Sequence, residues 1–269
     1  MMDFSALMSV YYKEKPENLL LAIKSVFEQT HAPLELVLVR DGPIGAPLQK
    51  AIDHAKNIYP IKLVPIEKNL GLGPALNHGL KFCKSDIIAR ADSDDISVRE
   101  RFGLQLSCFE KNPDLHLVGG LVEEFINRPK DTNRIKKVPL TYDQILQYSR
   151  KRNPFNHPTV MFKKKSVETV GSYENIPLFE DYHLWLKLLN DGFSMSNLDK
   201  VLVYFRIGNG MIERRMGWDY LRKEYYFAMK SYRSGLFSFL DFGEFIISRL
   251  PLRLFPKAFM RLVYISLRK

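Results

Sequence analysis

Three carboxylates lie within four residues at the end of an apolar run. The run Ile87 to Ala91 predicts a buried strand, and Asp92, Ser93, Asp94 and Asp95 follow it directly. In an open α/β sheet, ligands bind beyond the carboxyl ends of the strands, and carboxylates crowded there repel one another. A divalent cation such as Mg²⁺ or Mn²⁺ relieves this repulsion, because such cations prefer oxygen ligands and join carboxylates to substrate phosphates. The spacing therefore suggests a metal–diphosphate site.

The same acids have a structural alternative. Asp95 or Ser97 could cap a helix that starts near Arg99, because short polar side chains accept hydrogen bonds from the first backbone N–H groups of a helix. The acidic stretch alone leaves both interpretations open.

A second acidic feature is Glu180 and Asp181, at the start of the segment Phe179 to Leu189. Apolar residues at helical spacing and a closing Gly192 predict a short helix with the acids at its N-terminus. Acids favour that position because of the helix macrodipole. The functional alternative is a general base, held at the helix end and facing the metal site.

The strand predicted from Val201 to Phe205 is followed by Arg206, beside a glycine-containing loop. An arginine at a strand end could clamp a phosphate, or it could be an ordinary surface residue.

The elements before the acidic cluster repeat in the order strand then helix. We expect strands at 6–12, 34–39, 61–66 and 87–91, with helices at 16–30, 48–58, 75–83 and from 99 onward. This is the pattern of an α/β fold with a mostly parallel sheet and helices on both faces. The carboxyl ends of parallel strands meet at one edge, so Tyr11, Asp41, Asn69 and the acids from Asp92 to Asp95 should converge there.

The rest of the chain continues the sheet and ends in helices. We expect strands at 115–125, 159–162 and 201–205, helices at 141–149, 179–189 and 218–232, and a basic loop at 127–137. Gly71-Leu72-Gly73 lacks the six-residue dinucleotide fingerprint, and no Gly-Lys-Ser/Thr ending exists in the chain. These glycines either allow a tight turn or border a ligand.

Composition bounds the class of protein. The 269 residues are 46% hydrophobic, enough for a sizeable core, and two cysteines predict neither a disulfide framework nor a metal site. The absence of a disulfide framework favours a reducing cytoplasm, so we expect a cytoplasmic protein. No signal peptide and no apolar run of membrane-spanning length is evident.

The net charge of +10 is concentrated at the C-terminus, where residues 201–269 hold 13 Lys or Arg against 5 Asp or Glu. Four cations, Arg249, Arg253, Lys257 and Arg261, follow at steps of four among aromatic residues, and Pro251 and Pro256 are expected to break this segment into short helices. A basic stripe beside an aromatic face is typical of a helix lying in an anionic membrane surface. The alternative is a terminal helix packed on the domain with a solvated basic face.

The ordered set of motifs resembles glycosyltransferase family 2, the inverting family with the GT-A fold. The matching stretches, over roughly residues 4 to 206, are Met8 to Tyr12, Ser25 to Thr30, Val39 to Gly42, Asn69 to Gly73, Ala91 to Asp95, Arg99 to Phe102 and Phe179 to Asp181. The acidic cluster would then be the Asp-x-Asp motif of the family.

The resemblance implies roles for these residues. Tyr11 and Asp41 would line the nucleotide base, and Asp41 would accept a hydrogen bond from a uracil imide. Asn69 to Gly73, Gly71 included, would border the same pocket. Asp92 would lie near the ribose and donor sugar together with Ser93, and Asp94 would hold the metal, with Asp92 as a further metal-site candidate. Asp181 would be the general base that takes the proton from the acceptor hydroxyl.

The sequence also departs from the family pattern. Gly42 follows Asp41 where a second Asp is common, and Arg206-Ile207-Gly208 replaces an Arg-x-His element, so a second metal ligand is not defined. His157 is a candidate for the acceptor site or the metal, and its structural alternative is a satisfied histidine beside Pro158. Glu180 and Arg206 are further candidates for the acceptor or phosphate.

The predicted function is transfer of one sugar from a nucleotide-diphosphate donor, expected to be a UDP-sugar, to a glycan acceptor on a polyprenyl-diphosphate lipid. Such an enzyme of cell-surface polysaccharide biosynthesis would lie on the inner face of the cytoplasmic membrane and bind no nucleic acid. We expect a GT-A domain at 1–207, with halves of about 1–126 and 127–207, and a helical extension at 208–269. The alternatives are a sugar nucleotidyltransferase and a non-enzymatic nucleotide- or nucleic-acid-binding protein.

Overall fold

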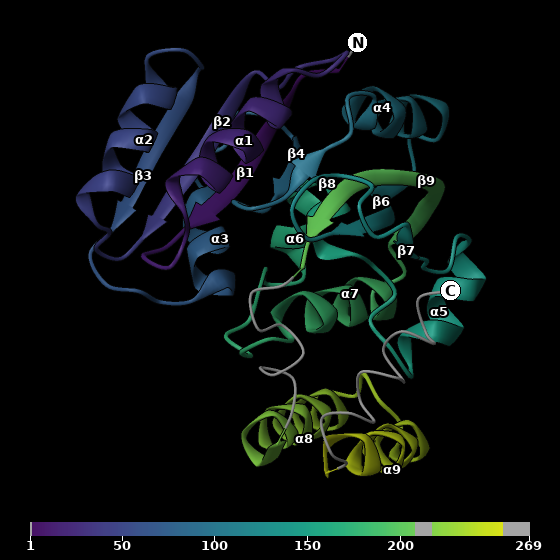
Figure 1. The fold of residues 1–269 in the computed structure, drawn as a ribbon. Helices are drawn as coiled ribbons and strands as arrows, with labels where there is room; N and C mark the ends of the chain where they lie inside the picture. Colours follow the sequence, from purple (N-terminus) through teal and green to yellow (C-terminus); the bar gives the residue numbers. More distant parts are fainter. Residues whose placement is uncertain (1, 208–216, 255–269) are drawn as a thin grey trace.

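The computed structural model describes residues 2–207 and 217–254, with side chains up to residue 249 (Figure 1). Its strands are β1 (Phe4–Val10), β2 (Glu35–Asp41), β3 (Ile61–Ile66), β4 (Ile87–Ala91), β5 (Ile96–Ser97), β6 (Leu115–Phe125), β7 (Arg134–Lys136), β8 (Met161–Lys163) and β9 (Ser194–Arg206). Its α-helices are α1 (Pro16–Phe27), α2 (Ala46–Lys56), α3 (Leu72–Leu80), α4 (Arg101–Lys111), α5 (Tyr142–Ser149), α6 (Lys164–Thr169), α7 (Glu180–Asn190), α8 (Gly217–Arg233) and α9 (Phe239–Leu254). A single 3₁₀ turn, η1, spans His157–Thr159 among these residues.

One sheet runs through the domain in the order β3-β2-β1-β4-β8-β6-β9-β5, with β7 paired to β6. The strands β3, β2, β1 and β4 are parallel, and so are β6 and β9, whereas β8 runs antiparallel between β4 and β6. The predicted mostly parallel α/β sheet is confirmed. The carboxyl ends of β1, β2 and β4 meet at one edge, as the strand–helix repeats require.

Alternating side chains of the parallel strands are buried on opposite faces of the sheet. Met8 of β1 packs in a cluster with α1, α2 and α4, whereas its neighbour Leu7 packs in a second cluster with α3, α5 and α7. The same alternation separates Leu38 from Val39 on β2. Both faces are therefore covered, which explains why these strands are nearly continuous apolar runs.

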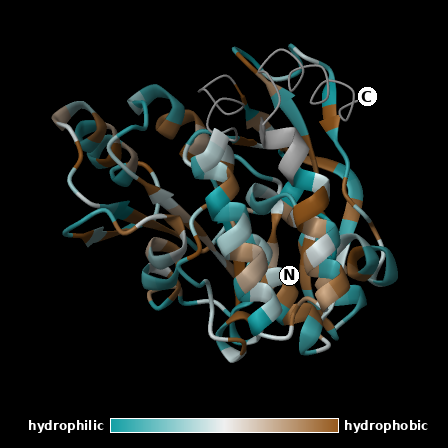
Figure 2. Cartoon of the chain, turned by 90° about the horizontal axis from the view of Figure 1, so that it is seen from below, coloured by the Kyte–Doolittle hydropathy of each residue, from teal (hydrophilic) through white to brown (hydrophobic). Residues whose placement is uncertain are grey.

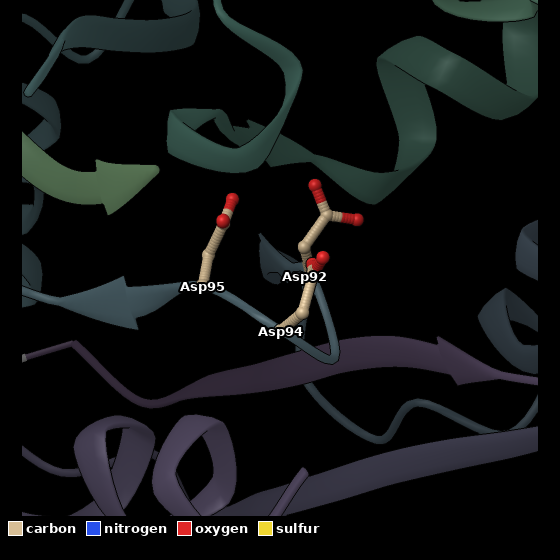
Figure 3. A group of neighbouring side chains, drawn as sticks. All are labelled: Asp92, Asp94 and Asp95. Atoms are coloured by element: carbon tan, nitrogen blue, oxygen red, sulfur yellow. The ribbon is translucent and has the colours of Figure 1, made fainter. Parts of the chain in front are cut away.

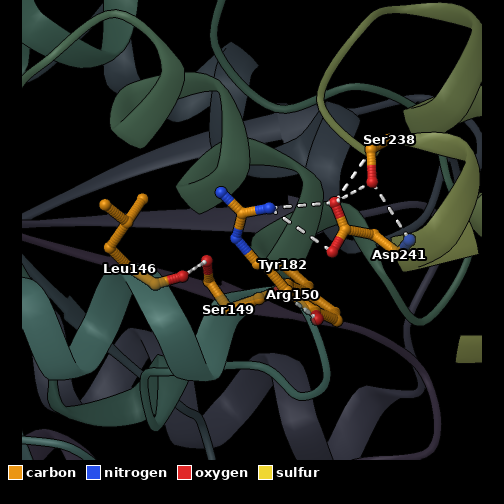
Figure 4. A network of polar contacts seen from close by, with 6 residues as sticks. All are labelled: Leu146, Ser149, Arg150, Tyr182, Ser238 and Asp241. Carbon is orange, nitrogen blue, oxygen red and sulfur yellow. Dashed lines mark hydrogen bonds and ion pairs between the residues drawn. The ribbon is translucent and has the colours of Figure 1, made fainter. Parts of the chain in front are cut away.

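Helices α8 and α9 pack beneath α7 and enlarge its apolar contacts (Figure 1). The cluster that joins them contains Ile176, Phe179, Tyr182, Leu186, Tyr220, Phe227, Ala228, Phe237 and Phe245. A polar contact adds to this packing, since Arg150 of the segment after α5 pairs with Asp241 of α9 at 3.2 Å (Figure 4). Nearby, Tyr182 joins α7 to α5 by donating to the Ser149 carbonyl at 2.5 Å. Apolar and polar residues alternate along both helices in the view from below (Figure 2).

The predicted basic stripe is wrong at its first position. Arg249 stacks over the Phe245 ring at 3.6 Å, pairs with Glu224 at 3.2 Å and donates to the Lys151 carbonyl at 2.6 Å. These contacts tie α9 to α8 and to the segment after α5, so the Arg249 guanidinium is not part of a solvated face.

The predicted break at Pro251 is also wrong, because α9 continues to Leu254. A proline removes one backbone hydrogen bond, and here that loss does not end the helix. The side chain of Arg253 and all of Pro256, Lys257 and Arg261 lie outside the described residues.

Two further expectations from the sequence are corrected. Helix α4 begins at Arg101 with Glu100 at its N-cap and no side-chain cap, so neither Asp95 nor Ser97 caps it. The segment 127–137 is not wholly a loop, because residues 134–136 form β7 on the edge of β6. No helix among the described residues has the length and apolar character needed to cross a membrane.

Candidate active site

The acidic turn after β4 brings three carboxylates together (Figure 3). Asp92, Asp94 and Asp95 each present an oxygen within 4.8 Å of the others. Burial, followed by repulsion from Asp92 and Glu14, raises the pKa of Asp94 to about 7. Burial, followed by repulsion from Asp94 and Asp92, raises the pKa of Asp95 well above its ordinary value. These carboxylates are costly to ionise together without a cation.

The donor set fits a divalent metal. Asp95 Oδ1 accepts a hydrogen bond from the Arg206 backbone N–H at 2.8 Å, whereas its buried Oδ2 has no hydrogen-bond partner among the described residues. An unsatisfied carboxylate oxygen beside two further carboxylates is a hard-oxygen arrangement suited to Mg²⁺ or Mn²⁺. Besides the predicted Asp94 and Asp92, the structure thus adds Asp95 as a possible ligand.

Two buried arginines, Arg90 and Arg101, interact with residues in and next to the acidic turn. Arg90 of β4, 2% exposed, forms an ion pair with Asp92. Arg101 of α4 is fully buried and donates to the Arg90 carbonyl at 2.7 Å and to the Ser97 hydroxyl at 3.1 Å. Their charges partly offset the repulsion among the acids, and their hydrogen bonds fix where the turn leaves the sheet.

A cavity of about 740 Å³ opens at this edge of the sheet. All the predicted donor-binding residues line it: Tyr11, Asp41, Asn69, Gly71, Asp92 and Ser93, together with Asp94. The sequence prediction that strand ends converge is therefore confirmed in position. The individual roles implied by the resemblance stay predictions.

We call this space the donor cavity, after the predicted donor-binding residues that line it, and Asp41 forms part of its wall. Its carboxylate oxygens accept hydrogen bonds from the backbone N–H groups of Leu70, at 2.8 Å, and Gly71, at 3.0 Å. Gly71 has a φ of 91°, which residues other than glycine rarely adopt. Asp41 and Gly71 together hold the loop between β3 and α3 against the cavity.

Glu14, which lies in the segment between β1 and α1, is not among the site residues predicted from the sequence. Glu14 accepts a hydrogen bond from the Ser93 hydroxyl at 2.8 Å and lines the donor cavity. The sequence contains a pattern that could have predicted this role, because Lys13-Glu14-Lys15 follow the first strand at the same sheet edge.

A second cavity of about 380 Å³ adjoins the first. Asp181, His157, Arg206, Asn153 and Lys136 line this cavity and not the donor cavity. Both cavities are lined by the same five residues where they meet: Leu72, Asp92, Asp94, Leu178 and Glu180. Asp92 and Asp94 of the acidic turn thus lie between two cavities, one lined by the predicted donor-binding residues and one lined by Asp181.

Asp181 lies in the first turn of α7 and has a defined orientation. Its Oδ2 accepts a hydrogen bond from Asn153 Nδ2 at 2.7 Å, and its Oδ1 accepts one from the Tyr182 backbone N–H at 2.7 Å. Burial raises the pKa of Asp181, although the hydrogen bond from Asn153 opposes the shift. Burial, then the charge of Asp181, raises the pKa of neighbouring Glu180 to about 7. A carboxylate held in this way is suited to accept a proton.

The remaining candidates lie on the wall of the second cavity. His157 contacts the Tyr173 hydroxyl through Nε2 at 3.0 Å, and burial, then the charge of Arg90, lowers its pKa well below the ordinary value. His157 is not part of the three-acid group, so its placement favours the acceptor side over the metal. Arg206 donates through Nε to the Asp94 carbonyl at 2.9 Å and stacks on Phe125 at 4.5 Å.

The sequence is similar to those of known glycosyltransferases. Residues 5–171 match the family model described as Glycosyl transferase family 2. Asp181 lies beyond the matched residues.

Two relatives match over nearly their whole length. The chain is 40% identical over 266 residues to the amylovoran biosynthesis glycosyltransferase AmsE of Erwinia amylovora, covering 99% of each chain. It is 42% identical over 261 residues to a UDP-Gal:alpha-D-GlcNAc-diphosphoundecaprenol beta-1,3-galactosyltransferase of Escherichia coli, covering 97% of this chain and 94% of the relative.

The fold also resembles solved structures. A crystal structure of S. aureus TarS 1-349 in complex with UDP-GlcNAc superposes with a TM-score of 0.67 at 17% identity, covering 86% of this chain and 67% of that one. A longer TarS chain has a TM-score of 0.64, and the match covers 40% of its length. The expectation of a GT-A fold is confirmed, and the chain belongs to glycosyltransferase family 2.

Proposed function

We propose that this chain moves one hexose from a UDP-sugar to a hydroxyl of a sugar on a polyprenyl-diphosphate lipid, with inversion at the anomeric carbon. The observation that carries the proposal is the pair of cavities joined at Asp92, Asp94 and Glu180, with Asp181 on the far side from the nucleotide residues. Donor and acceptor occupy one cavity each, and the sugar crosses at the junction. The product is a unit of a cell-surface polysaccharide; in support, one relative is named for amylovoran biosynthesis and the other for galactose transfer to a GlcNAc-diphosphoundecaprenol.

In the donor cavity, the protein binds the nucleotide and orients the diphosphate. Tyr11 and Asp41 line the base, and Asp41 accepts a hydrogen bond from the uracil imide with lone pairs left over from its two backbone hydrogen bonds. Asn69 and Gly71 border the base, and Ser93 lies near the ribose.

Asp94, with Asp92 and Asp95, would hold the divalent metal at the turn. When bound there, the metal neutralises charge on the leaving diphosphate. Arg206 fixes this turn through Asp94 and Asp95, which keeps the carboxylates aimed at the junction.

In the second cavity, Asp181 accepts the proton of the acceptor hydroxyl, and Asn153 holds the carboxylate in place. The hydroxyl oxygen then forms a bond to the anomeric carbon from the side opposite the diphosphate. The bond from that carbon to the diphosphate oxygen breaks, and the configuration inverts. His157 and Glu180 orient the acceptor sugar.

Because the acceptor is a lipid, we propose that the C-terminal helices bind the surface of the membrane that contains it. The exposed aromatic residues Trp218, Tyr225, Tyr226 and Tyr232 lie on α8 together with the exposed arginines Arg222 and Arg233. Of these aromatic residues, Tyr225 and Tyr232 also contact the Phe242 ring of α9. Aromatic residues among arginines suit the headgroup layer of an anionic membrane. We place the peripheral contact with the inner face of the cytoplasmic membrane on these residues of α8, in place of the stripe through Arg249.

Two measurements test the proposal. UDP-galactose, UDP-GlcNAc and GDP-mannose are each incubated with Mn²⁺ and a short-chain GlcNAc-diphospholipid, and product glycolipid is measured. We expect product with a UDP-sugar and none with GDP-mannose; product from GDP-mannose alone, or from none of the three, would contradict the donor assignment.

For the membrane contact, binding to vesicles of phosphatidylglycerol is compared for the wild type and Trp218→Ala/Tyr225→Ala. We expect at least a severalfold loss of binding in the double variant. Unchanged binding would place the contact elsewhere.

A further inference from the structure

Leu178 is held in an unfavourable state on two counts. Its φ of 73° lies in the left-handed region that leucine rarely adopts, and its apolar side chain is 53% exposed. Glycine at this position would avoid both costs. Backbone outliers of this kind concentrate at functional sites, where the surrounding structure maintains them.

The surrounding structure maintains this conformation through the neighbours of Leu178. Ile176 and Phe179 are buried against the C-terminal helices, and the Phe179 ring stacks on Phe227 of α8 at 5.0 Å. The Phe179 backbone N–H donates to the Ile176 carbonyl at 2.9 Å, which closes a tight turn. Ile176 and Phe179, the two ends of this turn, are packed against the C-terminal helices, whereas the side chain of Leu178 between them is exposed and lines both cavities.

The start of this segment is anchored by charge. Glu174 forms ion pairs with Lys187 of α7, at 3.3 Å, and with Lys230 of α8. The segment from Glu174 to Phe179 is therefore fixed at both ends, and it lines the donor cavity between them. Leu178 therefore lies in a segment whose ends are held by the ion pairs of Glu174 and the packing of Phe179.

Leu178 is presented at the place where the two cavities meet. It is one of the five residues that line both, with Leu72 as the other apolar one and three carboxylates as the rest. In the proposed function the sugar crosses this junction, so the anomeric carbon and the attacking oxygen meet beside Leu178. An aliphatic side chain there makes no hydrogen bond and fills space that water would otherwise occupy.

We propose that Leu178 is a positioning residue that excludes water from the transfer site and so favours sugar transfer over donor hydrolysis. The inference rests on the proposed function. In the competing reaction, a water oxygen bonds to the anomeric carbon and its proton passes to Asp181. The bond to the diphosphate oxygen breaks with its electron pair on the nucleoside diphosphate, and free sugar is released. Excluding water from an active site suppresses such side reactions.

The experiment measures UDP release and glycolipid product together, with UDP-galactose, Mn²⁺ and the GlcNAc-diphospholipid, for Leu178→Gly, Leu178→Ala and Leu178→Met. We expect the ratio of hydrolysis to transfer to rise about tenfold in Leu178→Gly and Leu178→Ala, and to stay near the wild-type ratio in Leu178→Met. The melting temperature of Leu178→Gly should not fall, because glycine adopts this φ without strain. The matched control is Leu34→Ala, a leucine 51% exposed and outside both cavities, which should keep the wild-type ratio.

The outcomes separate this inference from the proposed function. If the wild type transfers sugar and the Gly and Ala variants keep its hydrolysis ratio, water exclusion by Leu178 is overturned and the proposed function stands. A proportional fall of both reactions in these variants would likewise overturn water exclusion by Leu178 and leave the proposed function standing. A wild type that neither transfers nor hydrolyses any of the nucleotide sugars would overturn the proposed function and this inference together.

Discussion

The two acidic groups of the site differ in what surrounds them. In the turn after β4, three carboxylates face one another within 4.8 Å, and Asp95 Oδ2 lacks a hydrogen-bond donor among the described residues. At the start of α7, both oxygens of Asp181 accept hydrogen bonds, from Asn153 and from the Tyr182 backbone. Mutual repulsion in the first group would be relieved by a cation. Neutral donors around one carboxylate in the second leave it able to take a proton. Similar residues thus suit different chemistry.

We expect the largest loss of sugar transfer from a substitution of Asp181, in the second acidic group. Asp181→Asn removes the proton acceptor and keeps the shape of the side chain, so transfer should fall by about a thousandfold. Binding of UDP with Mn²⁺, measured by calorimetry, should stay unchanged because Asp181 lines the second cavity alone. Asp191→Asn, at the opposite end of α7, serves as the control. Transfer within tenfold of wild type would remove Asp181 as the base.

The corresponding test of the acidic turn is Asp94→Ala. It should weaken Mn²⁺-dependent UDP binding by about a hundredfold, because the remaining carboxylates alone hold the metal less well. The rise in melting temperature that UDP and Mn²⁺ give together should also disappear. Asp199→Ala, an exposed acid on β9, is the matched control. An unchanged affinity would mean that Asp94 holds no metal.

The environment of Asp181 can be changed without removing the carboxylate. Asn153→Ala deletes a hydrogen bond that favours the charged form, so the pKa of Asp181 should rise. Because the base acts when deprotonated, the acidic limb of the pH–rate profile should move to higher pH by up to about one unit. Asn190→Ala, exposed at the end of α7, should leave the profile in place. A limb that stays fixed, or moves to lower pH, would show that Asn153 does not tune the base.

The smallest expected effect concerns Glu180 at the junction. Its folded-state pKa of about 7 lies above the ordinary 4.5, so the folded state binds more protons than the unfolded state between these values. The wild type and Glu180→Gln should be equally stable below pH 4.5. As the pH rises to 7, the stability of the wild type should fall relative to that of the variant. Without metal, the variant should melt a few degrees higher at pH 7.5 and at about the same temperature at pH 4.5. An equal difference at both pH values would place the Glu180 carboxylate in solvent.

The hydrophobic periodicity of the sequence was sufficient to predict the strands and helices that form the core of the fold. Apolar runs such as Leu36 to Val39 could only be strands covered on both faces, and the helices between them required parallel pairing. Parallel strands bring their carboxyl ends to one edge, so Tyr11, Asp41, Asn69 and the acidic turn could be placed together before any coordinates. The short elements were missed, among them α6 and β5, because a few residues show no period.

Local patterns could not reveal the contacts between distant segments. The hydrogen bond from Asn153 to Asp181 joins residues 28 apart, and the Arg206 backbone reaches Asp95 across 111 residues. Likewise, the spacing of Arg249 predicted that it belongs to a basic stripe, but its contacts with Glu224 and Lys151 depend on how α9 packs.

By itself, the sequence determined the sheet, its active edge and the family, because hydrophobic period and short motifs are local properties of the chain. Only the tertiary structure decided that Asp95 lies with Asp92 and Asp94 in one acidic group, that two cavities meet at Glu180, and that Leu178 is held there with a positive φ. Those features depend on side chains brought together from β4, β9, α7 and α8. Their energies are set by burial and by neighbouring charge, which a linear pattern does not contain.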